Sequence, residues 1–244
     1  MRNIKLTIEY DGTNYSGWQI QKNSVSIQES IEKAIITVTG QSINLTGSSR
    51  TDAGVHAKGM TANFFCDTTI PEKSIAAAIN SKLPEDIAIL DAQYVDENFH
   101  SRYSSTGKRY SYTILNRRVS SPLLRNFAAH VWYPLCIDSM REACKYFLGT
   151  QDFSAFMSTG SSVKTTIRTI RLLNLVHSDD IIKLYIEADG FLYNMVRIIS
   201  GTLIDIGRGI ISPNDITRII ESKDRERAGK TAPPQGLCLE EVYY

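Results

Sequence analysis

The sequence has few cysteines and lacks long apolar runs, and each shortage excludes a class of protein. Its 244 residues contain four cysteines, none in a CxxC pair, so neither a zinc site nor a disulfide framework is indicated. No apolar stretch approaches the roughly 20 residues that span a bilayer. The N-terminus, MRNIKLTIEYDG, interrupts its apolar residues with charges, unlike a signal peptide or anchor. We therefore expect a cytoplasmic protein that binds no membrane.

Acidic residues are missing from two windows, although the net charge of the whole chain is only +1. Residues 98–137 carry six basic side chains without any Asp or Glu, and residues 153–178 carry Lys164, Arg168 and Arg171 without any acid. The first window also contains tyrosines and Trp132. Basic and aromatic side chains together suit a phosphate backbone and unstacked bases. A chance run of charge on a solvated surface is an equally good interpretation.

Hydrophobic periodicity and turn residues predict alternating strands and helices. In the first half, a capping box Ser26-x-x-Glu29 begins one helix that ends at Gly40, and a second helix runs from Ile75 to Leu83. In the second half, Ser139-x-x-Glu142 is a further capping box, and helices also begin near Phe191 and after Ser212-Pro213. The predicted strands span residues 4–10, 42–47, 60–66, 86–95, 108–115, 129–133, 165–177, 181–188 and 237–243.

This order predicts an α+β fold built from two βαββαβ, or ferredoxin-like, halves. We expect the halves, residues 1–104 and 105–244, to be related by pseudo-symmetry, with their sheets side by side. Helices would then cover one face and leave a central cleft for a ligand.

One loop places a carboxylate among small residues. Residues 47–57 read GSSRTDAGVHA, and the small side chains leave room for a ligand to approach. Arg50 could offer a forked donor to a phosphate, and Asp52 could act as general base or nucleophile. For an isolated RTD tripeptide, however, an aspartate that only caps a turn is the commoner case.

Further motifs place this loop in a known context. RTDAGVHA resembles the signature loop of the tRNA pseudouridine synthase A family, and the resemblance continues along nearly the whole chain. The other similar segments, in order, are EYDGTNYSGWQ (9–19), SIQESIEKAI (26–35), NFHSRYSSTGKRYSY (98–112), QDFSAF (151–156), RTI (168–170), FLYNMVRIISGTLIDIGRG (191–209) and APPQGLCLEEVYY (232–244).

The resemblance implies isomerisation of uridine to pseudouridine in the anticodon stem-loop of tRNA, at positions 38, 39 and 40. It implies no cofactor and no metal, which agrees with the lack of a P-loop, a dinucleotide fingerprint and metal-ligand spacing. It also implies a homodimer that binds tRNA. By motif, Asp52 is the single catalytic aspartate, Arg197 its basic partner, Tyr110 the aromatic that stacks on the target base, Arg50 an RNA contact and Leu237 part of the apolar wall beside the base.

The residues alone leave alternatives open for these roles. Tyr110 could simply pack within a strand, because it shares a face with Tyr112 and Ile114. Arg197, on an otherwise apolar helix, could extend to solvent, although pairing with Asp52 would keep that acid ionised and oriented. We expect His56 to be a structural, hydrogen-bonded histidine, and leave His100 as either structural or RNA-facing.

The chain also departs from the family pattern at four positions. Ser49 replaces a glycine before the RTD arginine and Met60 a glutamine, while Asn194 and Ile198 replace polar residues in FLYHMVRN. We expect these changes to remove hydrogen bonds without touching the catalytic residues.

Two other functions use the same features. A catalytically idle tRNA-binding protein or RNA chaperone would explain the basic windows but not Asp52. A glycoside- or nucleoside-cleaving hydrolase would normally need two carboxylates flanking the bond, and the motif loops offer only Asp52.

Overall fold

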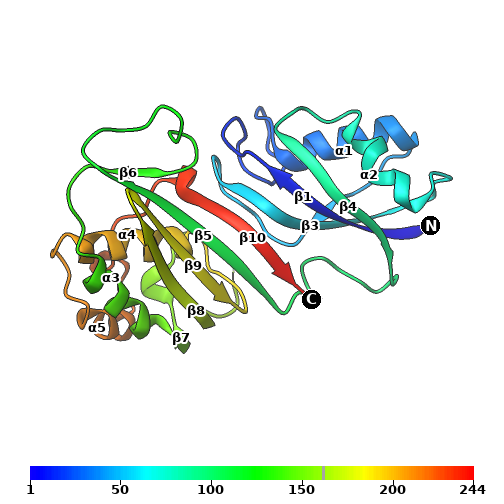
Figure 1. Ribbon diagram of the computed structural model, residues 1–244. Coiled ribbons are helices and arrows are strands. Elements are labelled where there is room, and N and C mark those ends of the chain that lie inside the picture. Colours follow the sequence, from blue (N-terminus) through cyan, green and yellow to red (C-terminus); the bar gives the residue numbers. More distant parts are fainter. Residues whose placement is uncertain (161–162) are drawn as a thin grey trace. The chain divides into compact units, whose positions relative to one another are not determined.

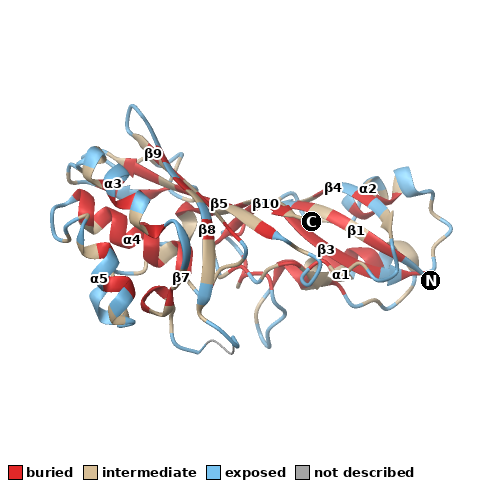
Figure 2. Ribbon diagram, turned by 90° about the horizontal axis from the view of Figure 1, so that it is seen from below, coloured by how far each residue is buried: buried red, intermediate tan, exposed pale blue. Residues whose placement is uncertain are grey.

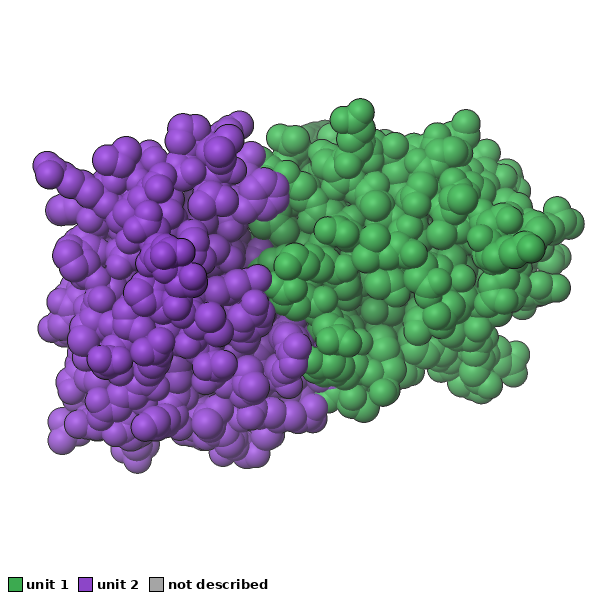
Figure 3. All heavy atoms as spheres, in the orientation of Figure 1, with its two compact units in different colours: residues 1–106, 238–244 green, residues 107–237 purple. Residues whose placement is uncertain are grey.

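The computed structural model describes residues 1–160 and 163–244 (Figure 1). Helices and strands are mixed along the chain, which divides into two compact units, coloured separately in Figure 3. Unit 1 comprises Met1–Thr106 and Cys238–Tyr244, and unit 2 comprises Gly107–Leu237. The chain therefore returns to unit 1 at its C-terminus.

Unit 1 contains a sheet in the order β4-β1-β3-β10, with β2 also paired to β3. Strands β4, β1, β3 and β2 pair antiparallel, whereas β10 runs parallel to β3. The strands are β1 (Arg2–Tyr10), β2 (Thr46–Gly47), β3 (His56–Cys66), β4 (Ile87–Val95) and β10 (Leu237–Tyr243), and the helices are α1 (Ile27–Thr39) and α2 (Glu72–Asn80).

The core of unit 1 follows from the alternation in β1. Ile4, Leu6 and Ile8 are at most 1% exposed, and successive side chains of a strand point to opposite faces. The short helices α1 and α2 contact one another, and Ile31 and Ile35 of α1 are fully buried.

Local signals fix the ends of α1 as the sequence indicated. The Ser26 hydroxyl accepts a hydrogen bond from the Glu29 amide at 3.3 Å, which satisfies an otherwise unpaired donor of the first turn. Gly40 ends the helix in a left-handed conformation with φ 70°, where glycine carries no Cβ penalty.

In unit 2, the strands pair in the order β5-β9-β8-β7, with β6 paired parallel to β5. Its strands are β5 (Gly107–Asn116), β6 (Ala129–Val131), β7 (Gly149–Asp152), β8 (Ile167–Ser178) and β9 (Ile181–Ala188). Its helices are α3 (Ile137–Cys144), α4 (Met195–Gly207) and α5 (Asp215–Ser222), with 3₁₀ turns η1 (Lys145–Phe147), η2 (Ser154–Phe156), η3 (Arg225–Arg227) and η4 (Pro234–Gly236).

Helix α4 lies in the interior of unit 2. Nearly all of its residues are buried, and it appears mostly red in Figure 2. A helix that is apolar almost all round requires cover on several sides. A polar side chain on α4 therefore needs a specific partner.

Several predicted boundaries differ from the structure. The capping box at Ser139 is wrong, since the N-cap of α3 is Cys136, three residues earlier, and the Ser139 hydroxyl contacts the Cys136 sulfur at 3.1 Å. Strand β7 was not predicted. Helix α4 begins at Met195 rather than near Phe191, β3 extends back to His56, and β2 is reduced to two residues.

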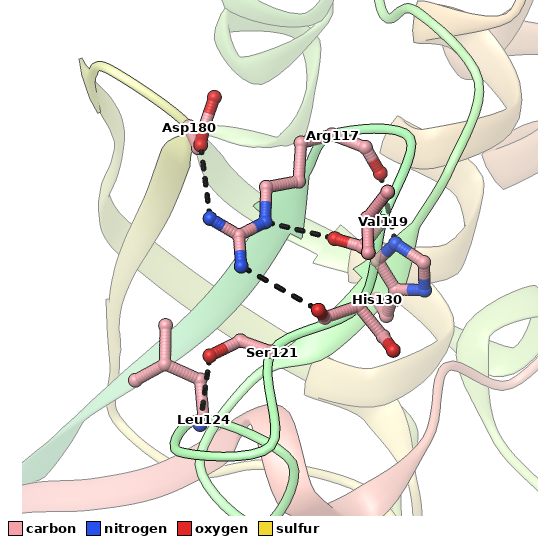
Figure 4. Close-up of polar contacts among 7 residues, drawn as sticks. Arg117, Val119, Ser121, Leu124, His130 and Asp180 are labelled. Carbon is pink, nitrogen blue, oxygen red and sulfur yellow. Dashed lines mark hydrogen bonds and ion pairs between the residues drawn. The ribbon is translucent and has the colours of Figure 1, made fainter.

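In the connection from β5 to β6, side chains bond to backbone carbonyls of the same segment (Figure 4). The Arg117 guanidinium donates to the carbonyl oxygen of Val119 at 2.8 Å and lies 3.4 Å from the Asp180 carboxylate. His130 contacts the Arg117 carbonyl at 2.8 Å. This arginine therefore holds the loop together.

Across the described part of the chain, every helix is too short or too polar to cross a membrane.

Candidate active site

The GSSRTDAGVHA loop lies against the first turn of unit 1. A Cβ on Gly17 would overlap the Thr51 carbonyl oxygen and lie 3.0 Å from the Asp52 carbonyl carbon, and one on Gly12 would overlap the Val55 carbonyl. Gly17 also has φ +94°, which L side chains rarely adopt. The glycines of EYDGTNYSGWQ therefore let two backbones meet, and this contact sets the position of the loop.

Hydrogen bonds on both sides of Asp52 hold the loop. The Thr51 hydroxyl pairs with the Tyr10 hydroxyl at 2.7 Å, and the Thr51 carbonyl accepts from the Trp18 amide at 3.0 Å. The Asp52 carbonyl accepts from the Val55 amide at 3.2 Å. Thr51 is buried, Asp52 half-buried and Arg50 exposed. The turn thus holds one carboxylate between the protein interior and solvent.

His56 closes the loop where β3 begins. It is 5% exposed, and its Nδ1 accepts the Gly12 amide at 3.1 Å. The Asp11 carboxylate lies equally close to Nδ1. A backbone N–H can only donate, so Nδ1 is the acceptor and we assign the bond to Gly12. His56 is therefore buried and hydrogen-bonded, which fits a structural role.

In unit 2, the Arg197 side chain on α4 is held at two points. Its Nε donates to the Ala232 carbonyl at 2.9 Å, and its Nη1 donates to Asn194 Oδ1 at 2.8 Å. The Asn194 amide donates in turn to the Ser158 hydroxyl at 3.0 Å. Asn194 makes these bonds from a left-handed conformation with φ 60°. The expectations that Asn194 removes hydrogen bonds and does not touch Arg197 are therefore wrong.

Close backbone packing fixes α4 against the segment before β10. The Ala232 amide donates to the Arg197 carbonyl at 3.0 Å, and the Gly229 amide donates to the Thr202 hydroxyl at 2.9 Å. A Cβ on Gly229 would lie 2.6 Å from the Thr202 Cα, and one on Gly201 would overlap the Lys230 carbonyl. The two motifs around 191–209 and 232–244 are thus fitted together by glycines, which orient Arg197.

The aromatic residues of β5 belong to the same unit. The Tyr110 ring is 7% exposed and meets the edge of Phe191 at 5.2 Å between centroids. The Tyr112 hydroxyl donates to the Pro233 carbonyl at 2.8 Å. Burial raises the pKa of Tyr112 above its usual range, and the positive charge of Arg197 partly offsets this effect. Tyr112 is therefore a neutral hydrogen-bond donor that supports the segment holding Arg197.

The residues singled out from the sequence thus fall into two groups. Asp52 and Arg50 belong to unit 1, while Tyr110, Arg197 and Leu237 belong to unit 2. Leu237 is 7% exposed, and its place beside the base stays a prediction. Sequence reasoning missed the supporting roles of Asn194 and Tyr112. The pairing of Asp52 with Arg197 stays a prediction.

Ion pairs with acids from elsewhere in the chain neutralise part of the positive charge of residues 98–137. Arg109 forms an ion pair with Glu187, and Arg117 does so with Asp180. Both acids lie far away in sequence, on or beside β9. Of the cations in that window, Arg102 is exposed, and its guanidinium carbon lies over the Tyr103 ring at 5.9 Å from the centroid. Among the described residues, no three His, Cys, Asp or Glu side chains are grouped as metal ligands would be.

Comparison with known proteins adds independent findings. A family model described as tRNA pseudouridine synthase matches residues 6–104 and 143–244. The chain is similar to tRNA pseudouridine synthase A 2 of Clostridium perfringens, with 54% identity over 244 residues and 100% of both chains covered. It is equally similar to tRNA pseudouridine synthase A of Acetivibrio thermocellus, at 54% identity and the same coverage.

Proposed function

Because this chain belongs to the tRNA pseudouridine synthase family, whose members are isomerases, we propose that it acts at positions 38, 39 and 40 of the tRNA anticodon stem-loop. The base of each target uridine is released from the ribose at N1, turned, and rejoined through C5. Asp52 is the single catalytic aspartate of this proposal, and no cofactor takes part.

The fixed position of Asp52 is the observation that carries the proposal. Thr51 and Val55 are tied into the surrounding fold on either side of it, and Gly12 and Gly17 pack against the same turn. A carboxylate whose backbone is fixed in advance loses little freedom when substrate binds, which favours reaction from the bound state. A half-buried site also leaves one side open to the nucleoside.

Arg197 is the proposed partner of Asp52. Arginine has five N–H donors in a planar fork, and Ala232 and Asn194 accept from two of them. A guanidinium directed at the carboxylate would hold Asp52 ionised. Removing it would leave a partly desolvated acid, at a cost of several kcal/mol.

Tyr110 and Leu237 are proposed to bind the extruded uracil. A base within a stem does not expose its glycosidic bond, so it must leave the stack at a cost of a few kcal/mol. Stacking on an aromatic side chain returns about 1–3 kcal/mol. Phe191 already fixes the plane of the Tyr110 ring, so little rotamer freedom remains to be lost. Arg50, exposed beside Asp52, is proposed to contact the RNA backbone.

The fold of the two halves, the cellular location and the oligomeric state are also part of this proposal. The strand order β4-β1-β3 with β2 beside β3 supports a ferredoxin-like half in unit 1, and we propose a related half in residues 105–244. We further propose a cytoplasmic homodimer that binds tRNA across both subunits.

Mapping pseudouridine in cellular tRNA tests the proposed positions. Cells that lack the protein should lose the modification at positions 38, 39 and 40, and the wild-type gene should restore it. A gene carrying Asp52→Ala should not. Loss at other positions, with 38–40 intact, would overturn the assignment of the substrate.

A further inference from the structure

The turn at residues 98–105 presents a stack of planar side chains on the surface of unit 1. Tyr103 is 78% exposed, and its ring centroid lies 4.3 Å from that of His100 with an interplanar angle of 34°. The Arg102 guanidinium carbon lies over the same ring, 5.9 Å from its centroid, at the outer limit of a cation–π contact. One face of Tyr103 is thus backed by an imidazole while most of the ring stays open.

Hydrogen bonds within the turn fix this arrangement. The amides of Arg102 and Tyr103 both donate to His100 Nδ1, at 3.1 and 3.3 Å, and the Ser104 amide donates to the His100 carbonyl at 2.9 Å. Because Nδ1 accepts, the proton of the neutral ring lies on Nε2. The imidazole therefore cannot turn without breaking bonds to both neighbours.

A buried polar network anchors the turn to the sheet. Ser101 is fully buried, its amide donates to Asn63 Oδ1 at 2.9 Å, and its hydroxyl donates to the Thr46 carbonyl at 2.6 Å. The Asn63 amide donates to Asn3 Oδ1 at 2.9 Å. Buried polar groups that are fully hydrogen-bonded make a segment rigid. A rigid, exposed aromatic loses little entropy when a ligand stacks on it.

The charge around the stack favours an anionic ligand. Asp96 and Glu97 precede the turn, but Asp96 accepts from the amide and side chain of Asn98. No acid occurs from residue 98 to residue 137, and Arg102 makes no ion pair among the described residues, in contrast to Arg109 and Arg117. A planar surface beside an unneutralised guanidinium matches a base and its adjoining phosphate. An acidic peptide would use Arg102 but would gain little from the open ring.

We propose that His100, Arg102 and Tyr103 form a binding site for an unpaired nucleotide of the tRNA substrate, with the base on Tyr103 and a flanking phosphate on Arg102. The proposal rests on the proposed function only in taking tRNA as the RNA. It assigns substrate binding, not chemistry, to these residues.

Tyr103→Leu and Arg102→Gln test the site, and Tyr103→Phe keeps the ring as the conservative variant. Arg2 and Tyr94 give matched controls, because the Arg2 guanidinium lies 4.7 Å over the Tyr94 ring elsewhere in unit 1. Dissociation constants for an unmodified tRNA transcript are measured over a series of salt concentrations, with kcat and KM from tritium release at C5-labelled uridine. Thermal melting confirms that each variant is folded.

Tyr103→Leu should weaken tRNA binding by about 5- to 30-fold, the equivalent of about 1–2 kcal/mol of stacking, with kcat unchanged. Tyr103→Phe should bind as the wild type does. Arg102→Gln should reduce the slope of log Kd against log salt by about 1, and Arg2→Gln should not.

Unchanged tRNA affinity in folded Tyr103→Leu, or a loss no larger than in Tyr94→Leu, would overturn the proposal. The result is separable from the catalytic assignment. If Asp52→Asn still releases tritium while Tyr103→Leu binds weakly, the proposed catalytic role fails and this site stands; wild-type binding by Tyr103→Leu with an inactive Asp52→Asn gives the reverse.

Discussion

Asn194 offers the sharpest test of how the fold orients Arg197. Its side chain accepts one bond from the guanidinium and donates another to Ser158, and its backbone has φ 60°. A hydrogen bond to a charged group contributes about 1.5–3 kcal/mol net. The left-handed backbone makes a second, separate contribution to the free energy of unfolding. A residue with a Cβ other than Asn or Asp is destabilised by about 1–2 kcal/mol in that conformation.

Two substitutions separate these terms. Asn194→Gly removes the side chain but suits the backbone, so kcat should fall by about 10- to 100-fold, the equivalent of the lost bond to Arg197, and the free energy of unfolding should fall only by the contribution of the lost hydrogen bonds. Asn194→Ala should lower kcat equally and reduce the free energy of unfolding by about 1–2 kcal/mol more than Asn194→Gly does. Asn194→His, which restores the residue usual in this family, should keep most of the activity, since an imidazole nitrogen can accept from Arg197.

Single-turnover tritium release measures the effect of the lost bond to Arg197 on catalysis, and urea denaturation measures the effect of the left-handed backbone on stability. Wild-type kcat in Asn194→Gly, alongside a large loss in Arg197→Gln, would refute the idea that Asn194 orients the guanidinium. Equal stability of the Gly and Ala variants would refute the claim that the left-handed backbone destabilises a residue with a Cβ at position 194.

Three further predictions concern the packing that supports the site. Gly17→Ala should lower both stability and kcat, because its Cβ would displace the Thr51 carbonyl beside Asp52; unchanged values in denaturation and turnover would contradict the proposed backbone contact. Gly201→Ala should destabilise unit 2, since overlap with the Lys230 carbonyl costs about 1–3 kcal/mol and outweighs the helix-propensity gain of about 1 kcal/mol; a raised melting temperature would show the reverse. Asp152 accepts from the Thr166 hydroxyl at 2.6 Å and pairs with Lys223 at 2.9 Å, and these contacts hold the pKa of that carboxyl well below its usual range. A lowered carboxyl pKa stabilises the fold above the ordinary value near 3.9 and loses that effect as pH falls below it, so Asp152→Asn should be less stable than wild type at pH 7 and approach it in acid; a pH-independent difference in melting temperature would contradict this.

Local signals in the sequence predicted those parts of the fold that local contacts determine. The helix α1 begins and ends as Ser26 and Gly40 indicate, because the capping bond and the left-handed glycine act within one turn. The turn between β8 and β9 was also placed correctly, since polar residues at 178–180 separate two apolar alternations.

Predictions failed where distant segments decide the outcome. The N-cap of α3 is Cys136 instead of Ser139, and the Cys136 amide bonds to the Gly207 carbonyl at 2.8 Å, at the far end of α4. Strand β7 has no hydrophobic alternation, and its pairing with β8 alone makes it a strand.

The candidate site shows the same division. Motifs indicated Asp52, Arg197 and Tyr110 by residue type, but the support of Arg197 by Asn194 depends on a left-handed turn that no periodicity signals. Likewise, Arg109 and Arg117 counted as free charge in the sequence, whereas Glu187 and Asp180 neutralise them in the fold.

Tritium release by Asp52→Asn in a single turnover, with enzyme in excess over C5-labelled tRNA, tests the central claim most directly. The substitution keeps the shape of the side chain and removes only its charge and basicity. If one fixed carboxylate performs the isomerisation, the variant should bind tRNA as tightly as the wild type and release no tritium above background. Release at the wild-type rate would contradict the account.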